Sequence, residues 1–485
     1  MEYRWRALAA VAFGTYMATM DFSIVNVALP TLAREFDRSP DAVVWATLIS
    51  SLAVTGLTLT AGRAGDLYGR KRVYLAGWAI FTAGMLLASF AATLEQLVAM
   101  RLLQSVGVAL AIANGNAIVT EAFPPAQRGQ ALGTTGAVVG AGLMSGPILG
   151  GLILQFFSWH AIFLLRVPIG LAALLLAWAV IRPSQPAGGP GSRRMDVPGA
   201  FALFATLSAA LLAVNRGQAW GWTSPAILAL FALAAASLAA FIRIESRSPS
   251  PVVALGLFRE RAYSVGVSSL ALNFAGQSAV TFLLPFYLQE VKGYSTGQVG
   301  LVVATVPLMM LLLSPLSGRA SDRYGFAHQA TVGIALVAIG LLSLATITAD
   351  TPLPAIIARL AVVGIGTSMF MSPNSATIMN SVPPDRLGTA SASVATARNI
   401  GNAVGLALAS AVLVAVATAS AGFAASRVAD LPDAAIVDGV RAAFAAAGVA
   451  SSFAVVASLF RGQRRVTVIA AEQAPVPGGG NTPAH

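Results

Sequence analysis

The chain has 485 residues, of which 56% are hydrophobic and only 10% are charged, and its formal net charge is +11. A soluble domain carries about 25% charged residues, so this composition excludes a water-soluble protein and indicates one that lies in a lipid bilayer. The positive charge points to arginines that stay on the cytoplasmic side during membrane insertion, rather than to a nucleic-acid partner.

Residues for metal or redox chemistry are scarce. The sequence has no cysteine and only three histidines. This excludes a disulfide framework and a thiolate metal site, and it argues against a histidine metal site. No nucleophile–base arrangement or phosphate-binding loop is recognisable. We therefore expect neither a metal nor a cofactor, and we expect a protein that is not an enzyme.

Apolar segments follow one another along the whole chain. A spanning helix needs about 20 mostly apolar residues, and fourteen segments approach this requirement. The first follows Arg4 and Arg6 and is longer than a signal-peptide core, so we expect it to be retained. The predicted spans are 7–29, 43–62, 73–92, 96–120, 130–155, 160–181, 198–214, 226–243, 264–288, 298–317, 329–347, 354–379, 388–416 and 440–460.

Basic residues indicate the orientation of these spans. With the N-terminus inside, most lysines and arginines fall in the inner loops, for example Arg70, Lys71 and Arg72. Because such residues are retained in the cytoplasm, both termini are predicted to be cytoplasmic, which requires an even number of spans. The sequence therefore predicts a multi-pass protein of the plasma membrane.

The chain contains an internal duplication. Gly62–Gly69 recurs as Gly318–Gly325, an offset of 318 − 62 = 256 residues, and three shorter pairs recur at nearly the same offset. Parallel repeats of this kind build transporter halves around a site near the middle of the membrane. We predict an all-α membrane protein of two six-helix bundles plus two extra spans. The predicted domains are 1–181 (N-terminal bundle), 182–262 (linkers and the two inserted spans), 263–460 (C-terminal bundle) and 461–485 (disordered cytoplasmic tail).

Asp21 is the only carboxylate that falls well inside a predicted span, where charges are costly and usually functional. The helical rise places Asp21 ~21 Å and Arg101 ~22 Å above the inner face of the membrane, so the two side chains could pair. A carboxylate that gains and loses an arginine neighbour can bind and release a proton. We predict that Asp21 and Arg101 couple transport to protons; the alternative is a static ion pair that orients two spans.

The two repeated loops are candidates for a gate. Their glycines permit tight turns, and Asp66 could bond to the N-terminus of the third span or pair across the inner face of the bundle. We predict a gate that is closed in one conformation; the alternative is a loop that only sets topology. The residues assigned to the gate are Gly62, Asp66, Gly69, Arg70, Gly318, Asp322, Arg323 and Gly325.

Small residues mark the fifth span. Glycines at four-residue spacing let helices approach closely, and a proline removes a backbone hydrogen bond and permits a kink. We predict that this span bends or seals; the alternative is tight packing alone. The motif residues are Gly142, Gly146, Pro147, Gly150 and Gly151.

Amide, methionine and aromatic side chains within the spans are candidates for a substrate cavity, because soft side chains suit varied ligands. The alternative for each is ordinary contact between helices or with lipid. The residues assigned to the cavity are Met17, Asn26, Asn114, Asn273, Gln277, Phe286 and Tyr287.

These motifs resemble the major facilitator superfamily and, within it, the fourteen-span drug:proton antiporters typified by EmrB and QacA. The resemblance covers residues 7–460 and implies a major facilitator fold, with a role in proton transfer for the arginine of the fourth span. The segments that carry it are Asp21–Pro30, Gly62–Arg72, Arg101–Gln104, Gly142–Gly151 and Leu284–Gln289.

Two positions depart from the family pattern. Ser105 stands where the fourth-span motif usually has glycine, and Arg166 stands where asparagine is usual, near the outer end of the sixth span. The C-terminal spans lack the extra acidic residues of relatives that export lipophilic cations. We therefore expect neutral, anionic or monocationic substrates rather than dicationic ones.

The resemblance implies multidrug efflux and antibiotic resistance: proton-coupled export of small lipophilic molecules by alternating access. One alternative is a proton symporter or facilitator that imports a small solute, and a more distant one is a membrane-embedded enzyme or a receptor. The expected partners are a small-molecule substrate, protons and the lipid bilayer; accessory export proteins are not readable from the sequence.

Overall fold

The computed structural model describes residues 2–184, 195–253, 255–423 and 431–459, and this part of the chain contains helices and no strand. The predicted tail 461–485 lies outside the described residues. The helices of the first half are α1 (Tyr3–Glu35), α2 (Pro40–Val43), α3 (Trp45–Tyr68), α4 (Arg70–Ala88), α5 (Leu94–Ala122), η1 (Pro125–Gln127), α6 (Arg128–Phe156), α7 (His160–Leu164) and α8 (Val167–Val180).

The remaining helices complete the connection and the second half. They are α9 (Val197–Trp220), α10 (Pro225–Glu245), η2 (Leu255–Arg259), α11 (Arg261–Phe286), η3 (Tyr287–Val291), α12 (Thr296–Val303), α13 (Thr305–Tyr324), α14 (Phe326–Leu344), α15 (Leu353–Asn380), η4 (Pro384–Arg386), α16 (Leu387–Ala421) and α17 (Asp433–Leu459).

Within the described residues, twelve helices are long and apolar enough to cross a membrane. Every predicted span coincides with helical structure, but two helices do not meet this criterion. α4 begins with three consecutive basic residues, and the apolar part of α14, His328–Leu344, is shorter than a typical span. The structure thus shows an all-helical protein with twelve candidate spans, and it does not show the predicted fourteen.

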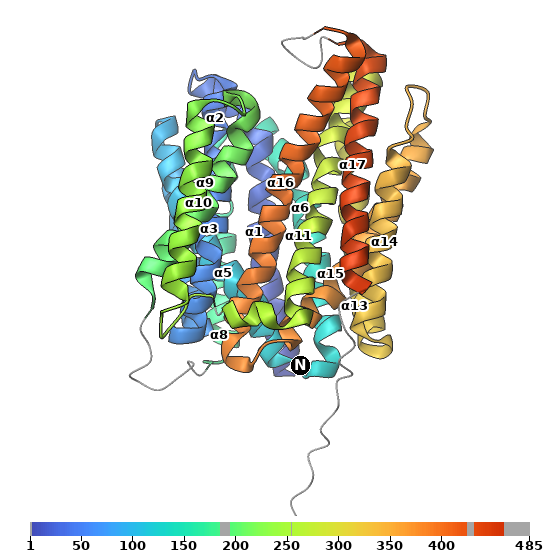
Figure 1. The fold of residues 1–485 in the computed structure, drawn as a ribbon. Helices are drawn as coiled ribbons and strands as arrows, with labels where there is room; N and C mark the ends of the chain where they lie inside the picture. Colours follow the sequence, from blue (N-terminus) through green and yellow to red (C-terminus); the bar gives the residue numbers. More distant parts are fainter. Residues whose placement is uncertain (1, 185–194, 254, 424–430, 460–485) are drawn as a thin grey trace, which may run out of the picture.

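The same helix pairs pack together in both halves. In the first half α1 packs on α6, and both α3 and α4 pack on α5; in the second half α11 packs on α16, and both α13 and α14 pack on α15. The halves meet crosswise, because α3 packs on α16 and α6 packs on α13. Figure 1 shows α14 and α17 on one side of the molecule and α3, α9 and α10 on the other.

The two helices between the halves lie outside both bundles. α9 packs on α3 and α16, and α10 packs on α9. Only 11% of the apolar stretch of α10 is buried inside the protein. An apolar helix that is so little covered by protein suits contact with lipid.

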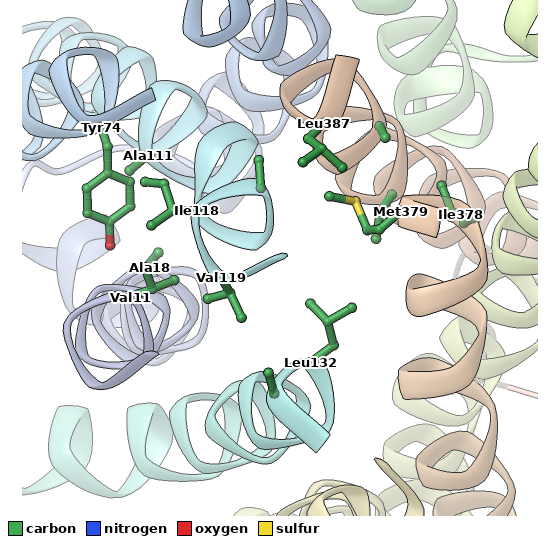
Figure 2. Packing of buried hydrophobic residues seen from close by; sticks show 14 of the residues in the cluster. Val11, Ala18, Tyr74, Ala111, Ile118, Val119, Leu132, Ile378, Met379 and Leu387 are labelled. Carbon is green, nitrogen blue, oxygen red and sulfur yellow. The ribbon is translucent and has the colours of Figure 1, made fainter. Parts of the chain in front are cut away.

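A hydrophobic cluster joins the halves at the end of the molecule where the N-terminus lies (Figure 1), which we call the N-side. Figure 2 shows Val119 of α5 and Leu132 of α6 on one side of the boundary, and Met379 of α15 and Leu387 of α16 on the other. These four side chains are at most 4% exposed. The two halves therefore share a core at the N-side.

The glycines of α6 let it pack closely on α1. A Cβ atom at Gly142 would collide with Thr19, and one at Gly146 would collide with Ser23. Gly151 has no such neighbour within 4 Å. The glycines at four-residue spacing therefore face α1, whereas Gly151 points away.

The rest of the motif follows the same geometry. Gly150 approaches Ile24 of α1, and Pro147 lies inside α6, which continues from Arg128 to Phe156. Close packing on α1 is thus observed, and a bending or sealing role for the motif stays a prediction.

We predict that Gly146→Ala destabilises the protein and that Gly151→Ala does not. The added methyl group at Gly146 forces α1 and α6 apart, and overpacking of this kind costs about 1–3 kcal/mol. Melting temperatures of the purified variants in detergent would test this. Equal melting temperatures for the two variants would contradict the packing described here.

Candidate functional site

Asp21 lies at the centre of a buried polar cluster in the first half. Asp21 is only 3% exposed. Arg101 Nη1 donates to Asp21 Oδ2 at 2.7 Å, and Arg166 Nη1 donates to Asp21 Oδ1 at 2.6 Å. Gln104 Nε2 also donates to Oδ1, at 2.9 Å. The pair of Asp21 and Arg101 expected from helix depth is therefore present, and Arg166 joins it.

Three elements hold these side chains in place. Arg101 and Gln104 are three residues apart on α5, so they lie on one face of that helix, towards α1. Arg101 Nε donates to the carbonyl of Ala46 at 3.2 Å. Arg166 stands at the junction of α7 and α8, where its Nε donates to the carbonyl of Ile162 at 2.6 Å. Backbone contacts thus aim both guanidinium groups at Asp21.

The cluster holds two guanidinium groups and one carboxylate, so it carries one excess positive charge. Both oxygens of Asp21 accept hydrogen bonds, whereas Arg166 Nη2 is buried without a partner among the described residues. Protonation of Asp21 here would leave two buried cations uncompensated, which is costly in a low dielectric. In this conformation the geometry favours the ionised carboxylate.

Sequence reasoning noted Arg166 as a departure from the family pattern but gave it no role. The available signal was a charged residue near the outer end of a predicted span, at a depth similar to that of Asp21 and Arg101. Pairing with Asp21 could not be inferred, because it depends on how the α7–α8 junction turns towards α1.

At the N-side, two aspartates bond across the boundary between the halves. Asp66, near the end of α3, accepts from the backbone N–H groups of Gly388 and Thr389 at 2.8 and 2.9 Å. These are the second and third residues of α16. Asp66 therefore caps a helix of the opposite half, rather than the third predicted span.

Asp322 does the same in the second half. Near the end of α13, it accepts from the backbone N–H groups of Gly129 and Gln130 at 2.9 and 2.8 Å. Both belong to the first turn of α6. Free N–H groups and the helix dipole favour a negative charge at a helix N-terminus. The two carboxylates thus hold the halves together at the N-side by equivalent contacts.

Arg70 strengthens only one of these contacts. Its Nη2 donates to Asp66 at 3.1 Å and to the carbonyl of Pro384 at 2.6 Å, and its Nη1 donates to Glu121 at 2.8 Å. The repeat offset places Phe326 at the equivalent position, since 70 + 256 = 326. The second half therefore has no arginine at that position.

Glycines allow the close approach at these contacts. Gly62 lies against Gly388, and Gly318 lies against Gly129, with no room for a Cβ atom at any of the four. Gly69 and Gly325 follow α3 and α13 with φ angles of 97° and 98°, a conformation that favours glycine. Arg323 lies in the last turn of α13 and is exposed.

A central cavity lies between the halves. Its walls come from α1, α4, α5 and α6 on one side and from α11, α15 and α16 on the other. Asn116, Phe274 and Arg398 are among the side chains that line it. None of the seven residues assigned to the cavity from the sequence lines it in this conformation.

Each step of one residue along a helix turns the direction of the side chain by about 100°. A residue predicted only from its place in a span can therefore point away from the cavity. Asn114 is buried and donates to the carbonyls of Ala61 and Leu110, so it joins α3 to α5. Tyr287 donates to the carbonyl of Thr348. Contact of these two with substrate stays a prediction.

The other five assigned residues also lie outside the cavity wall. Gln277 donates to Thr367 and Asn26 to the carbonyl of Phe22; Met17 and Asn273 are fully buried, and Phe286 packs on the core of the second half. Among the described residues, no group of three or more His, Cys, Asp or Glu side chains could hold a metal ion.

We predict that Asp21→Asn strongly destabilises the protein, because it leaves two buried guanidinium groups without a countercharge. Breaking a buried pair in this way costs about 3–5 kcal/mol. The double variant Asp21→Asn/Arg166→Asn retains one guanidinium and should recover part of the loss of melting temperature. Asp438→Asn, whose side chain is 48% exposed, is the control and should melt like the wild type. A double variant less stable than Asp21→Asn would contradict this charge count.

Comparison with known proteins agrees with this geometry. The profile of the Major Facilitator Superfamily matches residues 11–406. The riboflavin transporter RibZ of Clostridioides difficile (strain 630) is 36% identical over 409 residues, which cover 84% of this chain and 88% of RibZ. The multidrug resistance protein Stp of Mycobacterium tuberculosis (strain CDC 1551 / Oshkosh) is 31% identical over 409 residues, covering 84% of this chain and 75% of Stp.

A solved structure shares the fold. The crystal structure of the human organic anion transporter MFSD10 (TETRAN) superposes with a TM-score of 0.68 at 14% identity, covering 94% of this chain and all of that one. At this identity the likeness concerns the fold alone. With its family profile and its transporter relatives, the protein is a membrane transporter and not an enzyme, and it belongs to the Major Facilitator Superfamily.

Proposed function

We propose that the protein exports small lipophilic molecules, drugs among them, in exchange for protons. The observation that carries this proposal is the buried Asp21 carboxylate, held by Arg101 and Arg166 inside the bundle. A titratable group at this depth is rarely structural in a membrane protein. Its bonds to two different helical elements make it sensitive to any shift of α1.

The proposed cycle is alternating access around the central cavity. In the present conformation the Asp66 and Asp322 contacts close the N-side. When α1 moves away from one of the arginines, Asp21 can take up a proton; return of the arginine expels it. Proton release to one side and substrate release to the other would then alternate.

The topology belongs to the same proposal. We infer that α4 and α14 also span the membrane, which gives fourteen spans with both termini in the cytoplasm. Two observations support this: the two helices occupy matching positions beside α5 and α15, and basic residues such as Arg70, Lys71 and Arg72 concentrate at the N-side. The N-side is then the cytoplasmic side. The gate roles of Asp66 and Asp322 rest on this assignment.

The relatives support two directions of transport. The similarity to a multidrug resistance protein favours export, as does the resemblance of Gly142–Gly151 to the antiporter motif. The greater identity to a protein named a riboflavin transporter supports a second candidate, proton-coupled symport or facilitated import of a small solute.

A flux measurement in liposomes distinguishes these functions. Purified protein would be reconstituted and offered riboflavin and a set of neutral or singly charged fluorescent lipophilic dyes. Exchange predicts uptake above the equilibrium level into vesicles with an acidic interior. We expect Asp21→Asn/Arg166→Asn to lose this gradient-driven uptake, while Arg166→Asn, which keeps the carboxylate, retains it.

The other outcomes contradict specific parts of the proposal. Uptake driven only by an acidic exterior would replace exchange by symport. Equal gradient-driven uptake by the wild type and the double variant would show that Asp21 does not couple transport to protons.

A further inference from the structure

Among the described residues that line the central cavity, one side chain is charged, and it has no partner in the described part of the chain. Arg398 lies on α16, one turn beyond Val394 and Ala395, and all three residues line the cavity. Arg398 is partly exposed there and makes no hydrogen bond or ion pair with any described residue. It differs in this from Arg101 and Arg166, whose guanidinium groups are held by Asp21.

No carboxylate of the described residues compensates this charge. None of the described side chains that line the cavity is acidic. Asp21 does not line it, and both of its oxygens are occupied by Arg101, Arg166 and Gln104. A cation among spanning helices is costly unless it is paired or hydrated. The described protein therefore offers no anion that pairs with Arg398, and such an anion would have to come from a ligand.

A second donor lies in the same wall. Trp78 of α4 lines the same cavity and is 1% exposed, and its side chain interacts with the hydroxyl of Tyr74, another wall residue. An indole N–H and a guanidinium can only donate. Of these two donors, the guanidinium of Arg398 is the one that no described wall residue satisfies.

The rest of the wall suits an apolar body. Phe274, Leu270, Met371 and Ile112 surround the same space. Methionine and aromatic side chains adapt to ligands of varied shape, and the amide of Asn116 adds one more polar contact. A ligand that matches this wall combines an aromatic or aliphatic body with one negatively charged group.

We propose that Arg398 is the anion-recognition residue of the substrate cavity, and that the protein carries amphipathic organic anions such as carboxylates or sulfonates. The planar guanidinium can donate two parallel hydrogen bonds to such a group. The proposal rests on the proposed function in one respect, that the central cavity is the place where substrate binds.

Binding without any proton gradient tests this. Purified wild-type protein in detergent would be titrated with matched aromatic pairs: 2-naphthoate with 2-naphthamide, and naphthalene-2-sulfonate with naphthalene-2-sulfonamide. The readouts are calorimetric affinity and the shift of melting temperature. We expect the anions to bind the wild type more tightly than the amides do.

Three variants make the test specific. Arg398→Gln should weaken anion binding by about 10- to 100-fold, the loss expected for a hydrogen bond to a charged group, and leave amide binding unchanged. Arg398→Lys keeps the charge but lacks the paired donors of the guanidinium. Its anion affinity should therefore lie between those of the wild type and Arg398→Gln. Arg359→Gln removes a cation from α15 that does not line the cavity, and should bind like the wild type.

Clear outcomes overturn the proposal. Anions that bind the wild type no better than their amides would do so, as would equal losses in Arg398→Gln and Arg359→Gln. Arg398→Lys decides the question if Arg398→Gln does not fold. The proposal is contradicted if Arg398→Lys binds the anions as tightly as the wild type does and also binds the amides equally well. Equilibrium binding depends neither on a proton gradient nor on the direction of transport. If proton-coupled export is disproved, the binding result can therefore still be interpreted.

Discussion

The contacts on which this structure depends are two carboxylates that each cap a helix of the opposite half. Asp66 holds the start of α16, and Asp322 holds the start of α6. Each contact is local and reversible, because the N–H groups that it satisfies can be hydrated when the halves separate. Glycines on both sides remove the side chains that would keep the helices apart. In the proposed cycle, the N-side would therefore be held closed in this conformation and would still be able to open.

One helix connects this closure to the buried charge cluster. α6 is capped by Asp322 at Gly129 and packs on α1 through Gly142 and Gly146. α1 carries Asp21, whose oxygens are held by α5 and by the α7–α8 junction. A shift of α6 at the N-side must therefore move α1 relative to these arginines or break the glycine packing. In the proposed cycle, this packing is the route by which the position of the gate and the protonation of Asp21 would influence each other.

Much of this arrangement was predictable from sequence, because it depends on composition, repeats and helix depth. Every predicted apolar span coincides with helical structure, and the repeated loops contain Asp66 and Asp322. The estimated depth of Asp21 and Arg101 in the membrane predicted their pairing. The partners of the loop aspartates were not predictable, since they lie in the other half and far along the chain. The seven residues assigned to the cavity do not line it in this conformation, and their contact with substrate stays a prediction. Asn116 lines the cavity and Asn114 does not, because the two side chains point to different sides of α5, which hydropathy cannot distinguish.

The most direct test measures the separation of the halves at the N-side. The chain has no cysteine, so Tyr68→Cys in α3 and Asp385→Cys in η4, both exposed in the native protein, would be the only sites for spin labels. Distances between the labels would be recorded in liposomes for this background, for Asp66→Asn/Asp322→Asn, and for the exposed control Asp438→Asn. The capping account predicts that the double variant alone shifts the distance distribution towards longer separations. Identical distributions in all three would contradict it.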